Sequence, residues 1–122
     1  MSSFTIGLVK VPVTDFAAAT HYYRETLGLE EEFAVEQYGW AQYKVEPVPV
    51  CLYVVGMGGG EGPAGGEVDF HLVTDNLASF HEAYLERGGK TASELVSSAD
   101  GGMFVLLADP DGNKIKVVQR TA

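Results

Sequence analysis

The chain of 122 residues has little of what marks several large protein classes. Its single cysteine, Cys51, cannot form a disulfide within the chain. No apolar run reaches the ~20 residues that a membrane-spanning helix needs. Residues 1–5 lack the basic and apolar regions of a secretory signal. These absences predict a cytoplasmic protein that makes no use of a membrane.

Basic residues are also scarce. Eight Lys and Arg stand against 17 Asp and Glu, which gives a formal net charge of −9. Proteins that bind nucleic acid neutralise its phosphates with clustered Lys and Arg, so this composition argues against nucleic acid as a partner. The acidic surface is typical of a soluble protein rather than of a receptor for cations. The length is that of one domain.

One pattern of elements occurs twice. Val73-Thr74-Asp75 precedes the second predicted helix as Val13-Thr14-Asp15 precedes the first. One strand before each helix and three after it predict an α+β domain of two tandem βαβββ units, at about 4–56 and 67–120. The glycine-rich segment 57–66 between them is expected to be a flexible linker. The predicted helices cover 16–27 and 77–87, and the predicted strands cover 5–13, 31–36, 40–45, 50–55, 68–73, 91–96, 103–107 and 114–119.

The turn Asp-Pro-Asp-Gly-Asn at 109–113 separates two strands near the end of the chain. Pro110 presets φ for a turn and Gly112 permits a positive φ, so a closing β-hairpin is predicted. This turn, and the helix pattern from Asp15 through Tyr22-Tyr23 to Gly28, resemble the vicinal oxygen chelate superfamily, which includes glyoxalase I, extradiol dioxygenases and bleomycin-resistance proteins. The resemblance implies a glyoxalase-like pair of half-barrels with helices outside and a cleft on the inner faces.

Metal-using members of this superfamily have one ligand on the first and one on the last strand of each unit. The matching positions here are Leu8, Cys51 or Tyr53, Asp69 and Lys116. Aligning Asp75 with Asp15 would replace Asp69 by Val68, but that register would turn Asp69 and His71 into the core. Because an apolar side chain and an ammonium do not bind a divalent cation, we expect no metal and no other cofactor.

Strand alternation assigns further side chains to the cleft. If Ala41 and Tyr43 face the core, Trp40 and Gln42 face the cleft. The predicted ligand-binding residues are Lys10, Trp40, Gln42, Cys51, Tyr53, Asp69, His71 and Lys116. Trp40 has an alternative interpretation as a core or dimer residue, and Cys51 as a small buried hydrophobe. Asp69 and Lys116 are expected to form an ion pair across the cleft, either as part of a ligand site or as a structural bridge.

The resemblance and the loss of metal ligands together favour a metal-free protein that holds a small organic molecule, as bleomycin-resistance proteins do. The alternative is a lyase or dioxygenase that uses an atypical metal site, or His71 and Lys116 as an acid–base pair. A third hypothesis is a regulatory subunit without a ligand. Because the half-barrels leave strand edges uncovered, a homodimer is expected.

Overall fold

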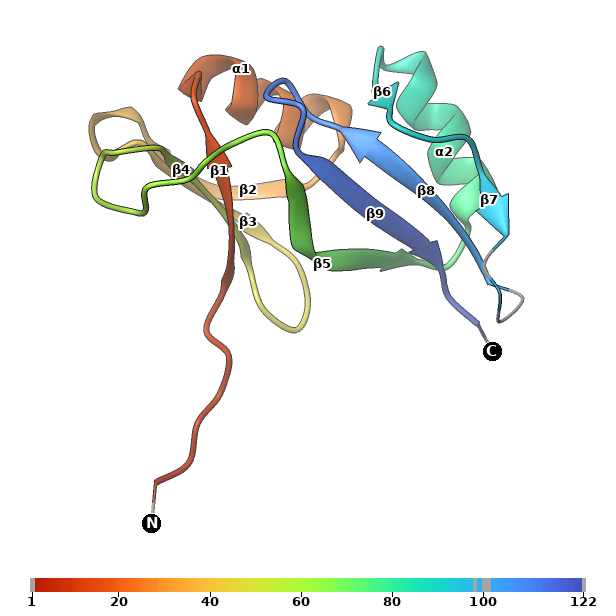
Figure 1. Ribbon diagram of the computed structural model, residues 1–122, viewed down its shortest axis with the longest axis horizontal. Coiled ribbons are helices and arrows are strands. Elements are labelled where there is room, and N and C mark those ends of the chain that lie inside the picture. The colour runs from red at the N-terminus through yellow and green to blue at the C-terminus, as the bar shows by residue number, and fades with distance from the viewer. Residues whose placement is uncertain (1, 98, 100–101, 122) are drawn as a thin grey trace.

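The computed structural model describes residues 2–97, 99 and 102–121, and it contains two sheets in an α+β arrangement (Figure 1). The first sheet has the strand order β1-β4-β3-β2, and the second has the order β5-β9-β8-β6, with β7 also paired to β8. Each sheet carries one helical segment, so the predicted pair of βαβββ units is confirmed. No helix within the described residues is long and apolar enough to cross a membrane.

The first module contains β1 (Val9–Val13), α1 (Phe16–His21), a π-helical turn (Tyr22–Thr26), β2 (Glu30–Val35), a 3-10 turn (Glu36–Tyr38), β3 (Trp40–Lys44) and β4 (Val50–Val54). The Asp15 side chain accepts a hydrogen bond from the Ala18 amide and so begins α1, as an N-cap does. The strand predicted over 5–13 is shorter than expected. Its ladder with β4 begins at Val9 opposite Val50, because residues 2–8 extend past the end of β4.

The second module contains β5 (Glu67–Thr74), α2 (Leu77–Glu86), β6 (Lys90–Thr91), β7 (Val96–Ser97), β8 (Met103–Ala108) and β9 (Lys114–Gln119). The single strand predicted over 91–96 is wrong, because two short strands replace it. Between them, the Ser93 hydroxyl accepts a hydrogen bond from the Leu106 amide, at 2.9 Å. A side chain thus takes the place of a backbone partner and interrupts the ladder.

One hydrophobic core joins the two modules through their helices. The hydroxyls of Tyr22 and Tyr84 lie 2.7 Å apart, and Tyr84 donates to the Lys90 carbonyl at 2.6 Å. Tyr84 has one proton to give, so Tyr22 donates to Tyr84. The Arg87 guanidinium also donates to the Thr26 carbonyl, at 2.9 Å. The helix-covered faces of both sheets therefore share one interior, and their helix-free faces point away from it.

The Asp-Pro-Asp-Gly-Asn turn attaches the last hairpin to the first module. The buried Asp109 carboxylate accepts hydrogen bonds from the Tyr23 hydroxyl at 2.7 Å and from the backbone amides of Asp111 and Asn113, each at 2.9 Å. The Asn113 side chain donates to the Pro12 carbonyl at 2.7 Å and accepts from the Gly65 amide at 2.7 Å. The turn that carried the resemblance is thus the polar joint between the modules.

The glycine-rich segment 57–66, the expected linker between the units, approaches the first sheet closely at Gly59 and Gly60. A Cβ atom at Gly59 would lie 2.7 Å from the Tyr53 Cβ, and one at Gly60 would lie 2.6 Å from the Tyr53 ring. At such distances a Cβ atom would force Tyr53 or the segment to shift, so glycine permits this close packing. The segment covers part of the surface formed by Tyr53 and Trp40.

Candidate functional site

The helix-free face of the first sheet carries five of the predicted ligand-binding residues. Strand pairing puts Lys10, Cys51 and Gln42 side by side on β1, β4 and β3, and it puts Tyr53 beside Trp40. Ala41 and Leu52, which alternate with them, are fully buried in the core, and Cys51 (0% exposed) and Tyr53 (8% exposed) are buried on the opposite face. Because neighbouring positions along a strand face opposite sides, the predicted set shares the face that points away from the helices.

Cys51 is a neutral, hydrogen-bonded thiol rather than a metal ligand. Its Sγ donates to Gln42 Oε1 at 3.4 Å, and Gln42 Nε2 donates to Glu32 Oε1 at 3.1 Å. Burial, helped by the negative charge of Glu32, raises the pKa of Cys51 to about 11. A thiolate, the form that attacks or binds metals, is therefore disfavoured at neutral pH. Glu32 was missed by the sequence analysis, because a register shift between Glu31 and Phe33 sets its place.

Lys10 is held at the edge of this face. Its Nζ donates to the Gly59 carbonyl at 2.7 Å and lies 5.0 Å from the centre of the Tyr53 ring. The ammonium thus bridges the glycine-rich segment and an aromatic face, a geometry in which the cation is attracted by the ring. Lys10 orders the segment that borders Trp40 and Tyr53.

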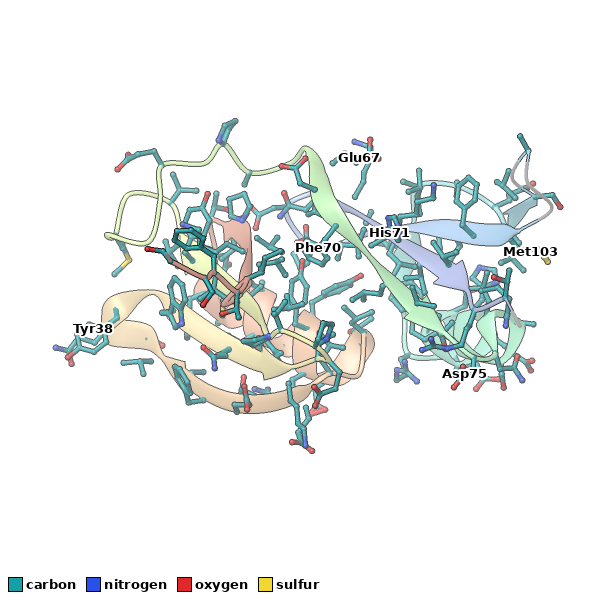
Figure 2. The ribbon with its side chains drawn as sticks, turned by 90° about the horizontal axis from the view of Figure 1, so that it is seen from below. Tyr38, Glu67, Phe70, His71, Asp75 and Met103 are labelled. Atoms are coloured by element: carbon teal, nitrogen blue, oxygen red, sulfur yellow. The ribbon has the colours of Figure 1, made fainter. Side chains whose placement is uncertain are left out.

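The helix-free face of the second sheet carries His71 and Lys116. They are direct neighbours on β5 and β9, and Lys116 Nζ lies 4.3 Å from the centre of the Phe104 ring on β8. Phe70, next in sequence to His71, packs against the core instead, and Figure 2 shows the two residues on opposite sides of β5. His71 is exposed and Lys116 is half-buried.

The predicted ion pair between Asp69 and Lys116 is wrong for the single chain. It is not among the ion pairs of the described residues, where Lys116 contacts Phe104 and stands beside His71. A register shift between Glu67 and His71 displaces Asp69 from the position opposite Lys116. The preferred register itself agrees with the structure, because Asp69 is exposed and Val68 packs against the core.

An apolar row crosses the same face of the second sheet. Strand pairing aligns Val73, Val118, Phe104 and Val96 on four adjacent strands. Val73 is 48% exposed and Val96 is 37% exposed, although both belong to one continuous apolar strip. Apolar strips of this kind on a sheet face mark surfaces that other molecules cover.

Three hollows lie near the predicted residues, and none of them collects the whole set. A hollow of about 380 Å³ between β1 and β5 is lined by Lys10, Tyr53 and Asp69. One of about 600 Å³ farther along β5 is lined by His71, and one of about 390 Å³ beside β2 is lined by Trp40. Gln42, Cys51 and Lys116 line none of these three. In a single chain, the predicted ligand-binding residues therefore do not line one common hollow.

The positions that the resemblance implies for metal ligands do not suit a divalent cation in this chain. Leu8 has no donor atom, Cys51 keeps its proton, and Lys116 is a cation above an aromatic ring. Within residues 2–97, 99 and 102–121, no three His, Cys, Asp or Glu side chains are grouped so as to hold a metal ion. The donor set thus offers at most Asp69 and His71, fewer ligands than such sites need.

The profile of the Glyoxalase/Bleomycin resistance protein/Dioxygenase superfamily matches residues 5–117, and the chain belongs to this superfamily. No curated protein sequence matches it. Solved structures with similar folds include three that match over nearly the whole chain. A superfamily member from Sphaerobacter thermophilus has a TM-score of 0.83 and 20% identity, over 97% of this chain and 98% of that one.

The second is lactoylglutathione lyase from Agrobacterium tumefaciens, with a TM-score of 0.80 and 17% identity over 98% of this chain and 96% of that one. The third is a bleomycin resistance determinant encoded on the transposon Tn5, with a TM-score of 0.70 and 21% identity over 98% of this chain and 100% of that one. At these identities the likeness establishes the fold, which agrees with the predicted glyoxalase-like architecture, and leaves the activity open.

Proposed function

We propose that this protein binds a small organic molecule without a metal ion, on the helix-free face formed by Trp40, Gln42, Cys51 and Tyr53. The observation that carries the proposal is the joint placement of the half-buried Trp40 and Gln42, beside the buried Tyr53, on a sheet face with no helix over it. Apolar surface with a few polar groups is typical of small-molecule sites. A relative named for bleomycin resistance has the same fold.

We further propose that a second copy completes the site. The helix-free faces of the two sheets point away from the core that the helices share, and separate hollows divide the predicted residues of one chain. In a two-fold dimer, the face bearing Trp40 and Gln42 in one copy would lie opposite the face bearing His71 and Lys116 in the other. The apolar row through Val73 and Phe104 would then be covered, and the ligand would be enclosed from both sides.

We favour binding over acid–base catalysis because of where Lys116 lies. Its Nζ sits 4.3 Å from the Phe104 ring centre, so this side chain is held against an aromatic face of its own sheet. His71 has no ion-pair partner among the described side chains that would orient it as a base. The pair is better suited to contacting an acidic or polar group of a ligand.

The test uses the fact that Trp40 is the only tryptophan in the chain. Its fluorescence therefore reports on the proposed face alone. We expect a small set of aromatic natural products, with bleomycin included as a probe, to contain a compound that quenches this emission saturably and raises the melting temperature. EDTA should change neither effect.

Two variants test whether the ligand binds on the proposed face or elsewhere on the surface. Gln42→Ala should weaken binding, whereas Glu82→Gln, on the exposed side of α2, should leave it unchanged. A ligand that stabilises the protein but binds equally well to the Gln42→Ala and Glu82→Gln variants, without quenching Trp40, would place the site elsewhere and refute the proposal.

A further inference from the structure

A hollow of about 600 Å³ lies where the two modules meet, and it is larger than the other two hollows described above. The first module lines it with residues 27–29 and 44–47, and the second module lines it with residues 71–74, Phe80, Val117 and Arg120. Its volume falls within the range of about 300–1,000 Å³ that is usual for small-molecule sites. Trp40, Gln42, Cys51 and Tyr53 do not line it, so this seam hollow is separate from the face of the proposed function.

The inner lining of the seam hollow is apolar. Leu27 is 5% exposed and Val117 is 2% exposed. Leu29, Leu72 and Phe80 are half-buried and pack against the same core, to which both modules contribute. Each of these three side chains leaves part of its apolar surface in water, and covering that surface is favourable. The seam hollow therefore suits a ligand with an apolar body.

The charged residues of the seam hollow reverse the charge balance of the chain. Lys44 and Arg120 are two of the eight Lys and Arg, whereas Glu46 alone of the Asp and Glu among the described residues lines the hollow. Lys44 is exposed and is absent from the ion pairs of the described side chains. In a protein with a net charge of −9, two cations beside one apolar hollow favour an anionic ligand over a cationic one.

Arg120 is held in place at the end of β5. Its backbone amide donates to the Thr74 carbonyl at 2.7 Å, and its Nε donates to Asp75 Oδ1 at 2.6 Å. A guanidinium has further N–H donors on its two terminal nitrogens, and these make no hydrogen bond to the described residues. The side chain is 61% exposed, so a ligand can reach it. Two parallel N–H groups of this kind bind a carboxylate in a bidentate manner.

We infer that the seam hollow binds an organic acid with an apolar body. The carboxylate lies against Arg120 and Lys44, and the body covers Leu29, Leu72 and Phe80. Because the two cations come from different modules, the bound acid connects the modules and stabilises the folded chain. This site goes beyond the proposed function, since it involves neither Trp40 nor a second copy.

Octanoate and decanoate are the probes, because each carries one carboxylate and no aromatic ring. We expect at least one of them to shift the amide signals of Leu29, Thr74 and Val117 saturably in 1H–15N NMR spectra, with a Kd below about 1 mM, and to raise the melting temperature. The indole N–H signal of Trp40 should not move. The inference fails if neither acid shifts these three amides at concentrations up to about 10 mM, or if only Trp40 responds.

Three variants that each remove one positive charge test the role of the two cations. Lys44→Gln and Arg120→Gln should each raise the Kd of the acid at least about fivefold. Lys90→Gln, on β6 and outside the seam hollow, should leave the Kd unchanged. All three side chains are exposed, so the fold is retained. Equal weakening by all three variants, or octylamine binding as tightly as octanoate, would overturn the inference.

The two sites can be refuted separately. Saturable binding of the acids at the seam hollow, without quenching of Trp40 by any aromatic compound, would support this inference and count against the proposed function. Quenching of Trp40 by an aromatic compound, without any effect of the acids on Leu29, Thr74 and Val117, would support the proposed function and overturn this inference.

Discussion

The Tyr23→Phe substitution tests whether the Asp-Pro-Asp-Gly-Asn turn joins the two modules. Tyr23 is 1% exposed, and its hydroxyl donates to the Asp109 carboxylate at 2.7 Å. Burial, followed by the negative charge of Asp109, raises the pKa of Tyr23 well above its ordinary value, so the phenol remains a donor at all physiological pH values. The substitution removes one oxygen atom and leaves the ring in place.

The expected loss of unfolding free energy depends on the hydrogen bonds that Asp109 retains in the variant. Its carboxylate still accepts from the amides of Asp111 and Asn113 and from the Asn113 side chain. The loss is therefore one hydrogen bond to a charged group, without an orphaned carboxylate, which is worth about 1.5–3 kcal/mol. For a domain of this size, that cost lowers the melting temperature by about 5–10 °C.

Urea unfolding measures the free energy directly, and Tyr38→Phe is the matched control because Tyr38 is 64% exposed. We expect the control to stay within about 0.5 kcal/mol of the natural chain. In an Asp109→Asn background, Tyr23→Phe should cost less, because the charge that strengthens the hydrogen bond has gone. Strict additivity of the two substitutions, or a Tyr23→Phe cost equal to that of Tyr38→Phe, would refute the role assigned to the turn.

Three further outcomes are expected. Gly60→Ala should destabilise the chain by about 1–3 kcal/mol, because its Cβ would lie 2.6 Å from the Tyr53 ring, whereas Gly66→Ala, with nothing within 4 Å, should be nearly neutral in urea unfolding. Cys51 should be alkylated far more slowly in the folded than in the unfolded chain at pH 8. Its pKa is about 11 when folded and 9.0 when free, so the folded state keeps a proton that the unfolded state loses, and the stability from this thiol should fall as pH rises from 9 toward 11. Finally, EDTA should leave the melting temperature unchanged, and a loss of one equivalent of metal with a lower melting temperature would contradict the proposal of a metal-free site.

Much of the fold was readable from local patterns. The repeated Val-Thr-Asp motif and the turn at 109–113 identified two βαβββ units, because capping and turn chemistry act over a few residues. Alternation correctly separated Trp40 and Gln42 from Ala41 and Tyr43, since a buried strand face tolerates no slip in register.

Tertiary structure decided what depends on distant segments. The register shift before His71 puts that residue, rather than Asp69, beside Lys116, and a bulge of this kind has no mark in the sequence. The sequence of the glycine-rich segment does not show that Gly59 and Gly60 lie directly against Tyr53, where a side chain would collide with it. Above all, the Tyr22–Tyr84 contact turns both helix-free faces away from the shared core. Local propensity cannot specify that packing, because it arises from burying two helices against each other, and it is what leaves each chain with only part of the proposed site.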